Sequence, residues 1–532
     1  MRAWCRGAGP GAVTGLLLGL LALGPGLGRG FLLSYDMVFV PREPFSAALP
    51  GLAPPRAVPS DLVVAVASRI LPGDVVQKIV LLAIFVIGCA GAALLLDDRR
   101  RQPLLARLAA GVFYVWNPYV GERLIIGHWA LLLGYAGLPW VLRAATAPDV
   151  TSRRGAARLV LAIVPAVIGG FAAMAVTALV LVPAAVVFNG TASGNVRKAG
   201  LLIGTLFIGS LPWLIPSLLH PVYADPGGVA AFAARADTPF GSVGSLLMLG
   251  GIWNAQTVPA GYGGGWSVLW LAVVLVALAG FLVLGRRSLG YWRPLCLAAA
   301  LGLIVASIGV TAAGRDLLRS AIGAEPGVAI LQDAQQFVAP LAVAGAAGLG
   351  MVVAWVVNPC RYEKKSDQLA VTALAVLAIV VPVLLLPGLA WGAAGRLRPV
   401  WYPASWLEAA RAIDASQARG AVLLLPWASD RTWAWNHGER MLDPWPRLVS
   451  RAVIWNDGTQ VGASGTTLRL APDDPAARRL DAVVSGTGPL TGALRAAGVA
   501  FVVDDAADSV AGRLPGARVV ATGPELTVYS LG

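Results

Sequence analysis

Residues 158–188 of the chain read RLVLAIVPAVIGGFAAMAVTALVLVPAAVVF, and the number of times this tract crosses a membrane decides the fold. As one helix, its roughly 30 residues would be about 45 Å long, too long for a hydrocarbon core of about 30 Å without steep tilt. Gly169 and Gly170 offer a break near the middle. We therefore expect a tight pair of short helices, one of which could be re-entrant.

The composition is that of an integral membrane protein. Of 532 residues, 57% are hydrophobic and 13% are charged, and the mean hydropathy is +0.71, whereas soluble domains carry about 25% charged residues. A soluble fold is excluded. Further apolar runs long enough to cross a bilayer lie at about 12–30, 77–96, 104–120, 129–143, 200–219, 266–285, 294–311, 337–357 and 368–390.

Basic residues between these runs set the expected orientation, because cytoplasmic loops of membrane proteins are enriched in Lys and Arg. All the clusters fall on one side only if 158–188 is a helical pair. The expected protein is a multi-pass plasma-membrane protein with about eleven spans, a cytoplasmic N-terminus and an extracytoplasmic C-terminus. The same clusters account for the net charge of +13 without nucleic acid. They are Arg99 to Arg101, Arg143 with Arg153 and Arg154, Arg197 with Lys198, Arg286 and Arg287 with Arg293, and Arg361 with Lys364 and Lys365.

The first apolar run follows Arg2 and Arg6 and resembles a signal peptide, but it has no convincing small-x-small cleavage site. We interpret it as a retained first span. The four cysteines, Cys5, Cys89, Cys296 and Cys360, fall in expected spans or cytoplasmic segments. They offer neither a disulfide framework nor a CxxC metal site.

A soluble α/β domain is expected after the last span, so the chain divides into a membrane domain, 1–392, and an extracytoplasmic domain, 393–532. Residues 405–415 have helical spacing and lead through Gly420 into the apolar strand AVLLLPW. Residues 490–503 repeat this helix-turn-strand unit, and 517–531 read as a closing hairpin. The tryptophans of 430–446 fit a core or a membrane interface better than sugar stacking.

The expected topology leaves outward loops at 31–76, 220–265 and 312–336, and a short outward stretch at 118–128. The first loop begins FLLSYDMVFVPREPF, which places Asp36, Arg42 and Glu43 close to the membrane surface. A carboxylate there can act as a general base if its surroundings tune it. The alternative for Asp36 is a solvated acid or a helix cap.

The short outward stretch, WNPYVGERLIIGHW, presents Glu122, Arg123 and His128 between two spans. Ionisable groups at membrane depth cost roughly 2.5 to 3.5 kcal/mol each, so they tend to mark a site or a water-filled cavity. Arg123 suits a phosphate, and His128 can relay a proton or donate a hydrogen bond. The alternative is a Glu122–Arg123 ion pair at the lipid headgroups.

The later loops add polar residues that are weak signals one by one. FAARAD and the following LLMLGGIWN supply Arg235, Asp237 and Trp253, and LQDAQQF supplies Asp333 and Gln336. Together they would assemble a polar pocket on one face of the bundle. The sequence lacks HExxH, GxxxxGK[ST] and GxSxG motifs, which argues against a zinc hydrolase, a P-loop ATPase or an α/β-hydrolase.

The stretches NPYVGERLIIGHWALLLGYAGLPW, FAARAD…LLMLGGIWN, LQDAQQF and YPASWLEAARAID…GAVLLLPW resemble large prokaryotic membrane proteins related to the GT-C glycosyltransferases, of actinobacterial cell-envelope type. The resemblance covers most of the chain in order. It implies a polyprenyl-phosphate sugar donor and a catalytic acid in the first outward loop, the place of Asp36. The paired-acid or DxD-like signature of many GT-C enzymes is missing, and the nearest second acid is Glu43.

The resemblance therefore implies transfer of a sugar from polyprenyl phosphate to an envelope glycan or glycolipid on the outer face, with Asp36 as the base. Arg42, Glu43, Glu122, Arg123, His128, Arg235, Asp237, Trp253, Asp333 and Gln336 would bind the substrates. A divalent metal is possible, but no other cofactor is expected, and no nucleic acid. The alternative is a non-catalytic membrane protein that transports or scaffolds lipid-linked envelope intermediates.

Overall fold

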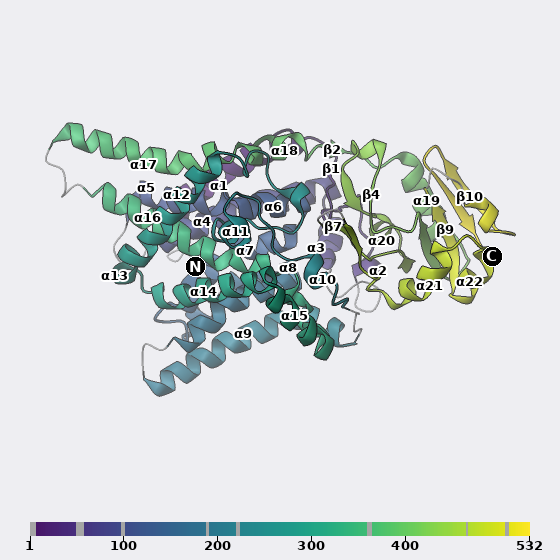
Figure 1. Cartoon of the computed structure of the whole chain (residues 1–532), viewed down its shortest axis with the longest axis horizontal. Coiled ribbons are helices and arrows are strands. Elements are labelled where there is room, and N and C mark those ends of the chain that lie inside the picture. Colours follow the sequence, from purple (N-terminus) through teal and green to yellow (C-terminus); the bar gives the residue numbers. More distant parts are fainter. Residues whose placement is uncertain are drawn as a thin grey trace.

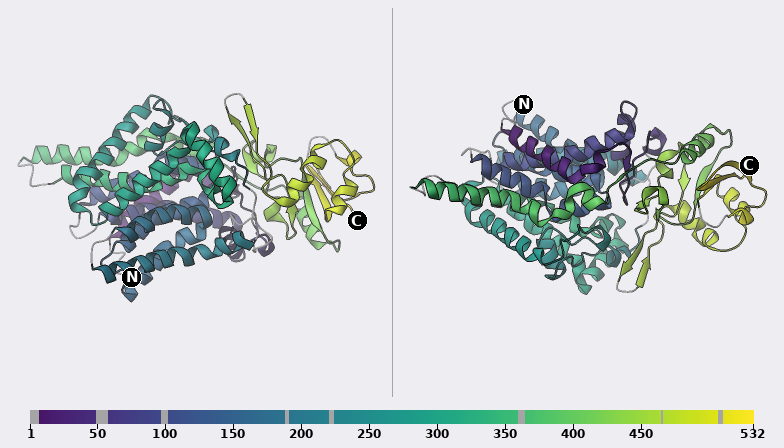
Figure 2. Two further views of the ribbon diagram at one scale, coloured as in Figure 1. Left: turned by 60° about the horizontal axis from the view of Figure 1, so that its bottom comes forward. Right: turned by 90° about the horizontal axis from the view of Figure 1, so that it is seen from above.

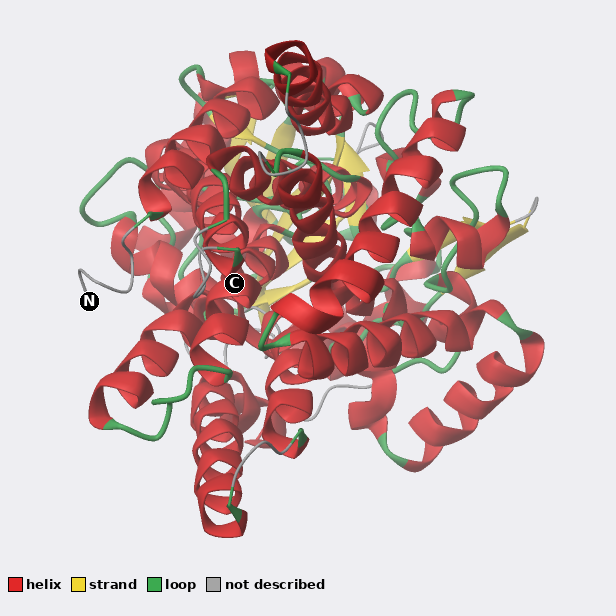
Figure 3. Ribbon diagram, turned by 90° about the vertical axis from the view of Figure 1, so that its left-hand side faces the viewer, coloured by secondary structure: helices red, strands yellow, loops and turns green. Residues whose placement is uncertain are grey.

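The computed structural model describes residues 7–48, 58–96, 102–187, 191–219, 224–358, 364–463, 466–505 and 510–532. Figure 1 shows a bundle of helices joined at one end to a strand-containing C-terminal domain, and both views of Figure 2 agree. Seen along the bundle, the strands lie behind the helices (Figure 3). We call the end of the bundle that carries this domain the domain-facing end.

Eight helical segments of the described chain are long and apolar enough to cross a bilayer. The expected spans 104–120 and 129–143 correspond to α5 (Leu104–Val115) and α7 (Trp129–Ala145). These two helices have 12 and 17 residues, fewer than each of the eight long segments. The structure therefore does not confirm a count of eleven. The long segments are α1 with η1 (Ala8–Leu27), α4 (Gly73–Leu95), α8 (Arg153–Val186), α9 (Ala192–Leu219), α12 to α13 (Trp266–Ser288), α14 with η5 (Trp292–Val310), η7 with α16 (Ala334–Val356), and most of α17 (Lys365–Leu385).

Residues 158–186 of the tract lie in α8, whose chain folds back at Gly170. This glycine has φ 74° and ψ −147°, which are not helical values. A Cβ placed on Gly134 of α7 would lie 2.4 Å from the Ala173 Cβ and 3.5 Å from the Ala166 Cα. In a straight helix those two alanines would be about 10 Å apart along the axis. The reversal is the helical pair expected from the sequence.

The end of the bundle opposite the C-terminal domain carries basic residues. Figure 1 places α13 (Arg286–Ser288) and the start of α17 there. The clusters at Arg99 to Arg101 and at Arg361 lie outside the described residues, as do Cys5 and Cys360. The described basic residues of α13 therefore lie far from the C-terminal domain, and the orientation in the membrane stays a prediction.

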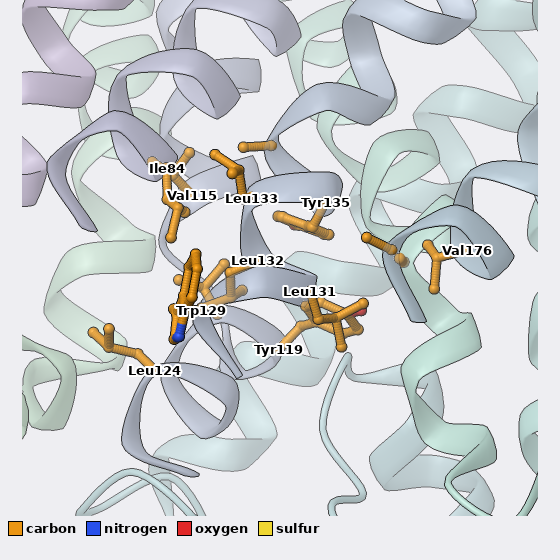
Figure 4. Close-up of a cluster of buried hydrophobic side chains, with 14 of the residues drawn as sticks. Ile84, Val115, Tyr119, Leu124, Trp129, Leu131, Leu132, Leu133, Tyr135 and Val176 are labelled. Carbon is orange, nitrogen blue, oxygen red and sulfur yellow. The ribbon is translucent and has the colours of Figure 1, made fainter. Parts of the chain in front are cut away.

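The core of the bundle centres on α7. Its small residues allow close packing against α8, and its large ones fill the space toward α4, α5 and α6 (Pro118–Ile126) (Figure 4). The rings of Tyr114 and Tyr119 stack on Tyr135 with centroids 4.3 and 4.7 Å away. These aromatic contacts fix α5, α6 and α7 as one unit, which matters because α6 carries polar residues.

The C-terminal domain has the expected α/β order. The helix α19 (Ala404–Ala415) precedes β3 (Ala421–Leu425), α22 (Thr491–Ala496) precedes β9 (Val499–Asp504), and β10 (Arg518–Gly523) forms a hairpin with β11 (Leu526–Ser530). The five-stranded sheet has the order β10-β11-β9-β3-β6, where β3 is parallel to β9 and to β6 (Val453–Ile454).

Tryptophans form much of the core beneath this sheet. Trp406 and Trp445 are fully buried and stack at 5.5 Å, with Trp433 and Trp435 packed edge-on against Trp406. A core role was one of the two roles expected from the sequence.

The remaining elements lie in loops and connections. They are β1 (Phe31–Leu32), α2 (Phe45–Ala48), α3 (Ser60–Ala67), α10 (Gly228–Ala231), α11 (Gly241–Leu247), η3 (Ala255–Thr257), α15 (Ala312–Ala324), η6 (Pro326–Leu331), η9 (Pro387–Leu389), α18 (Ala390–Gly395), β2 (Pro399–Val400), β4 (Asp430–Thr432), η10 (Ala434–Asn436), β5 (Arg440–Leu442), α20 (Trp445–Leu448), β7 (Gln460–Ala463), β8 (Thr466–Arg469), α21 (Pro475–Ser485) and η11 (Ala511–Arg513).

Candidate functional site

The short helix α6 places the conspicuous polar residues of WNPYVGERLIIGHW. Asn117 caps it by accepting a hydrogen bond from the Val120 amide at 3.1 Å, and Pro118 occupies the first helical position, where its missing N–H costs nothing. The helix ends at Gly127, which has φ +87°. His128 follows at once, so Glu122 and Arg123 are inside the helix and His128 is just beyond it.

Asp36 and His128 meet at the domain-facing end of the bundle. Asp36 Oδ2 lies 3.1 Å from His128 Nε2, and the two side chains are 48% and 20% exposed. The Asp36 amide donates to the Ile126 carbonyl at 3.0 Å. A side chain on Gly127 would collide with the first loop, because its Cβ would lie 2.2 Å from the Met37 nitrogen. Gly127 thus permits the contact between the two loops.

Glu122, Arg123 and Asp237 form a buried charged cluster beside this pair. Glu122 Oε2 lies 3.6 Å from an Arg123 guanidinium nitrogen, and both residues are at most 1% exposed. The Arg123 guanidinium also lies 3.6 Å from the centre of the Tyr119 ring, a cation–π contact. Nε and one terminal nitrogen of Arg123 have no hydrogen-bond partner among the described residues.

The two carboxyl groups of the cluster meet over Gly250. A Cβ on Gly250 would lie 2.7 Å from Asp237 Oδ2, 2.9 Å from the Tyr262 hydroxyl and 3.0 Å from Glu122 Oε1. Burial, followed by the charge of Asp237, raises the pKa of Glu122 well above its usual value. Burial also raises the pKa of Asp237, although the Gly251 amide donates to its carboxylate. The pair therefore favours a bound proton.

Asp333, which directly precedes η7, also lies close to this cluster. Burial raises its pKa, while the charges of His128 and Arg123 act in the opposite direction and Asp36 adds to the rise. The Gln335 side-chain amide donates to the Asp333 carboxylate. The backbone carbonyl of Gln336 accepts a hydrogen bond from the Tyr119 hydroxyl at 2.9 Å. This bond holds the ring against which the Arg123 guanidinium packs.

The structure brings together Asp36, Glu122, Arg123, His128, Asp237, Asp333 and Gln336, and it places the other proposed site residues elsewhere. Arg42 is exposed. Arg235 donates to the Gly462 carbonyl of β7 at 3.0 Å. Trp253 packs edge-on against Phe232 at 5.0 Å, beside the β7–β8 hairpin.

Glu43 belongs to a second, separate charged group. It is 1% exposed, and its Oε1 lies 3.8 Å from Arg447 of α20, which also bonds Asp61 at 3.1 Å. Burial and the charge of Asp61 raise the pKa of Glu43 well above its usual value, although Arg447 opposes this. This group ties the first loop to the C-terminal domain.

Sequence reasoning missed three side chains that build the site. Tyr119 supports Arg123, and Tyr262 meets the acid pair. Gln77 in α4 bonds both backbone groups of Leu32, at 2.9 and 2.7 Å, as a neighbouring strand would. The signal available for Gln77 was the presence of two polar residues, Gln77 and Lys78, at the start of an apolar span. Nothing local distinguishes the two tyrosines from ordinary core residues.

An apolar groove of about 170 Å³ lies between α3, α4, α7 and α8. Trp129, which directly follows His128, forms one wall and stacks on Phe39 at 5.2 Å. Val63 and Ile79 at its rim are 39% and 51% exposed, so the groove lies at the surface of the bundle. Its lining residues are Val63, Val64, Ala67, Leu71, Val76, Ile79, Val80, Trp129, Leu133 and Ile168.

The described residues contain no group of three or more His, Cys, Asp or Glu side chains that could hold a metal ion. Asp36 and His128 would supply two ligands, and the buried Glu122 and Asp237 are turned toward each other over Gly250. Among the described residues, these side chains do not form a metal site built by the protein alone.

Solved structures of a known enzyme have a similar fold. The arabinofuranosyltransferase AftD from mycobacteria aligns with a TM-score of 0.60 at 18% sequence identity, over 100% of this chain and 40% of the AftD chain. A mutant form of AftD gives a TM-score of 0.60 at 17% identity, over 42% of that chain. The chain shares its fold with AftD. It spans less than half the length of these structures.

At this level of identity the comparison shows a shared fold. Sequence comparisons add nothing further, since no protein-family model and no curated protein matches the chain. The shared fold extends over both the helical bundle and the C-terminal domain, because the whole chain is covered.

Proposed function

We propose that this protein is a membrane glycosyltransferase of GT-C type, which moves a sugar from a polyprenyl-phosphate donor to an envelope glycan or glycolipid on the outer face. The observation that carries the proposal is the 3.1 Å contact between Asp36 and His128, beside the buried Arg123 and three further acids. A general base must reach its proton directly or through one water. Asp36, half exposed, is accessible to an acceptor.

In the proposed reaction, Asp36 accepts the proton of an acceptor hydroxyl while that oxygen bonds to the anomeric carbon of the donor sugar. The bond from this carbon to the phosphate oxygen breaks, and its electron pair stays on the departing polyprenyl phosphate. His128 Nε2, 3.1 Å from Asp36, orients the carboxylate. Arg123 offsets the charge that develops on the phosphate, where a preorganised cation is most effective because water is excluded.

Two observations support a lipid-linked donor. The apolar groove lies beside Trp129, the residue after His128, so an isoprenoid tail seated there would have its phosphate near the polar cluster. Nε and one terminal nitrogen of Arg123 have no hydrogen-bond partner among the described residues, and a guanidinium binds phosphate oxygens in a planar, bidentate manner. The fold of AftD favours arabinofuranose as the sugar to test first.

The test uses the full chain in lipid nanodiscs with a synthetic polyprenyl-phospho-arabinofuranose and an arabinan oligosaccharide acceptor. The wild-type chain should extend the acceptor, and Asp36→Asn should lower the rate by at least about 100-fold. The matched control, Asp316→Asn on the exposed face of α15, should keep the rate. Wild-type transfer that survives in Asp36→Asn would refute the mechanism. Donor binding without turnover would favour the transport or scaffold alternative.

A further inference from the structure

The residue before the proposed base is held by the C-terminal domain. The Tyr35 amide donates to the Arg440 carbonyl of β5 at 2.7 Å, and the Tyr35 carbonyl accepts from the Leu442 amide at 2.9 Å. The two segments thus form a parallel bridge between Tyr35 and Met441. Residue 35 therefore behaves as an added strand position on β5.

Tyr35 needs such support, because its backbone has φ +44°. Residues with a side chain rarely adopt this left-handed conformation unless surrounding contacts impose it. The Tyr35 hydroxyl is also held, since it donates to Gln256 Oε1 at 2.6 Å. The turn at Tyr35 directs the chain so that the next amide, that of Asp36, reaches the Ile126 carbonyl.

The C-terminal domain contacts the first loop both before and after Asp36. Before it, β1 (Phe31–Leu32) pairs with β2 (Pro399–Val400) in antiparallel register. After it, the Tyr402 hydroxyl donates to the Phe39 carbonyl at 2.8 Å. Further along, Arg447 bonds Asp61. A domain that only held the acceptor would not need to bind this loop at four places.

We infer that the C-terminal domain positions the proposed base, with the Leu442 amide as the main positioning group. The Asp36 amide donates a hydrogen bond to Ile126 of the bundle, and the preceding residue, Tyr35, is hydrogen-bonded to β5 of the C-terminal domain. The inference rests on the proposed function for its catalytic consequence. It assigns the domain a role in the transfer step itself, because Asp36 is the group that accepts the proton of the attacking hydroxyl.

The test compares two variants at one position, in the full chain in nanodiscs. Leu442→Pro removes the amide donor, whereas Leu442→Ala keeps it and trims the side chain. One readout is release of arabinose from polyprenyl-phospho-arabinofuranose with no glycan acceptor present, which needs the base but no acceptor site. A second readout is the imidazole resonance of His128 in a His220→Gln, His437→Asn background, which leaves a single histidine and needs no substrate.

Leu442→Pro should slow donor hydrolysis and glycan transfer together, on the order of 100-fold, because a misplacement of about 1 Å at a reacting group has an effect of that size. It should also move the His128 resonance toward its position in Asp36→Asn. Leu442→Ala should change neither. Loss of glycan transfer alone, with hydrolysis and the His128 resonance unchanged, would overturn the inference and leave the domain as an acceptor site.

If Leu442→Pro does not fold, Tyr402→Phe is used instead, because it removes the hydroxyl bound to Phe39 and keeps the ring. Unchanged donor hydrolysis and unchanged hydrogen exchange at residues 36–40 in this variant would overturn the inference. If the wild-type chain hydrolyses no donor, the proposed function fails. The His128 resonance in Leu442→Pro then decides the positioning role by itself, with an unshifted signal counting against it.

Discussion

Asp36 Oδ2 and His128 Nε2 lie 3.1 Å apart, although Asp36 belongs to the first loop and His128 to the turn between α6 and α7. The contact depends on how closely these two segments approach. The Ile126 carbonyl accepts the Asp36 amide, and Gly127 leaves room for Met37.

Gly127→Ala should separate Asp36 from His128. Its Cβ would lie 2.2 Å from the Met37 nitrogen, and alanine is strained at φ +87°. We expect a loss of about 1–3 kcal/mol in unfolding free energy, with a shifted His128 resonance. Thermal unfolding followed by tryptophan fluorescence measures the first effect. Gly204→Ala in α9, where nothing lies within 4 Å, is the control and should be neutral. Equal stability of the two variants would contradict this account.

Arg123→Lys should weaken donor use. Lysine keeps the charge but loses the planar contact with the Tyr119 ring and the fork of donors that suits phosphate. The rate with polyprenyl-phospho-arabinofuranose should fall at least about tenfold. Steady-state kinetics with a varied donor concentration measure it. Arg319→Lys, in the exposed ion pair of α15, should have no effect. A fully active Arg123→Lys would exclude bidentate phosphate binding by Arg123.

Ala67→Phe should fill the apolar groove from α3. Ala67 lines the groove, whereas Val66, its neighbour, is 49% exposed and does not. The KM for a long-chain polyprenyl donor should rise about tenfold, equivalent to about 1.4 kcal/mol of lost binding, while a donor with a two-isoprene tail should be used as before. Val66→Phe is the matched control. The same response to both tail lengths would show that the groove does not hold the tail.

The stability of the chain should fall as the pH rises because of Glu43. Its pKa is raised in the folded state, so the folded chain holds this proton more tightly than the unfolded chain. The resulting stability is present below the ordinary pKa of about 4.5 and is lost as the pH rises through the higher folded value. Glu43→Gln, which cannot ionise, should flatten this fall in thermal melts between pH 4 and 8. Glu408→Gln, on the exposed face of α19, should keep it. A wild-type slope in Glu43→Gln would contradict the burial argument.

A reporter fused after Gly190, between α8 and α9, should give a cytoplasmic signal, because α8 folds back at Gly170. A second fusion after Ser485, in the C-terminal domain, should give an extracytoplasmic signal. Reporter enzymes active on one side only, such as a phosphatase that needs the periplasm, make the measurement. The same side for both fusions would overturn the expected orientation.

The sequence alone determined the class of the protein and several elements of its C-terminal domain. Composition and long apolar runs predict membrane helices because a bilayer demands about 20 apolar residues per span. Local periodicity predicted α19, β3, α22, β9 and the β10–β11 hairpin, since each depends on near neighbours. The glycine break at 169–170 and the polar residues of the outward loops were also visible. Such local patterns could not show which of those loops contact each other.

Tertiary structure alone decided the membership of the site. Glu122 meets Asp237 over Gly250, and Tyr35 pairs with β5, but no spacing in the sequence encodes either contact. Glu43, grouped with Asp36 from their proximity in one loop, is instead bound by Arg447 of the C-terminal domain. The physical reason is that contacts between distant segments depend on packing and on which backbones can approach closely. At Gly127 the approach is possible only because no side chain is present, since a Cβ there would meet the Met37 backbone.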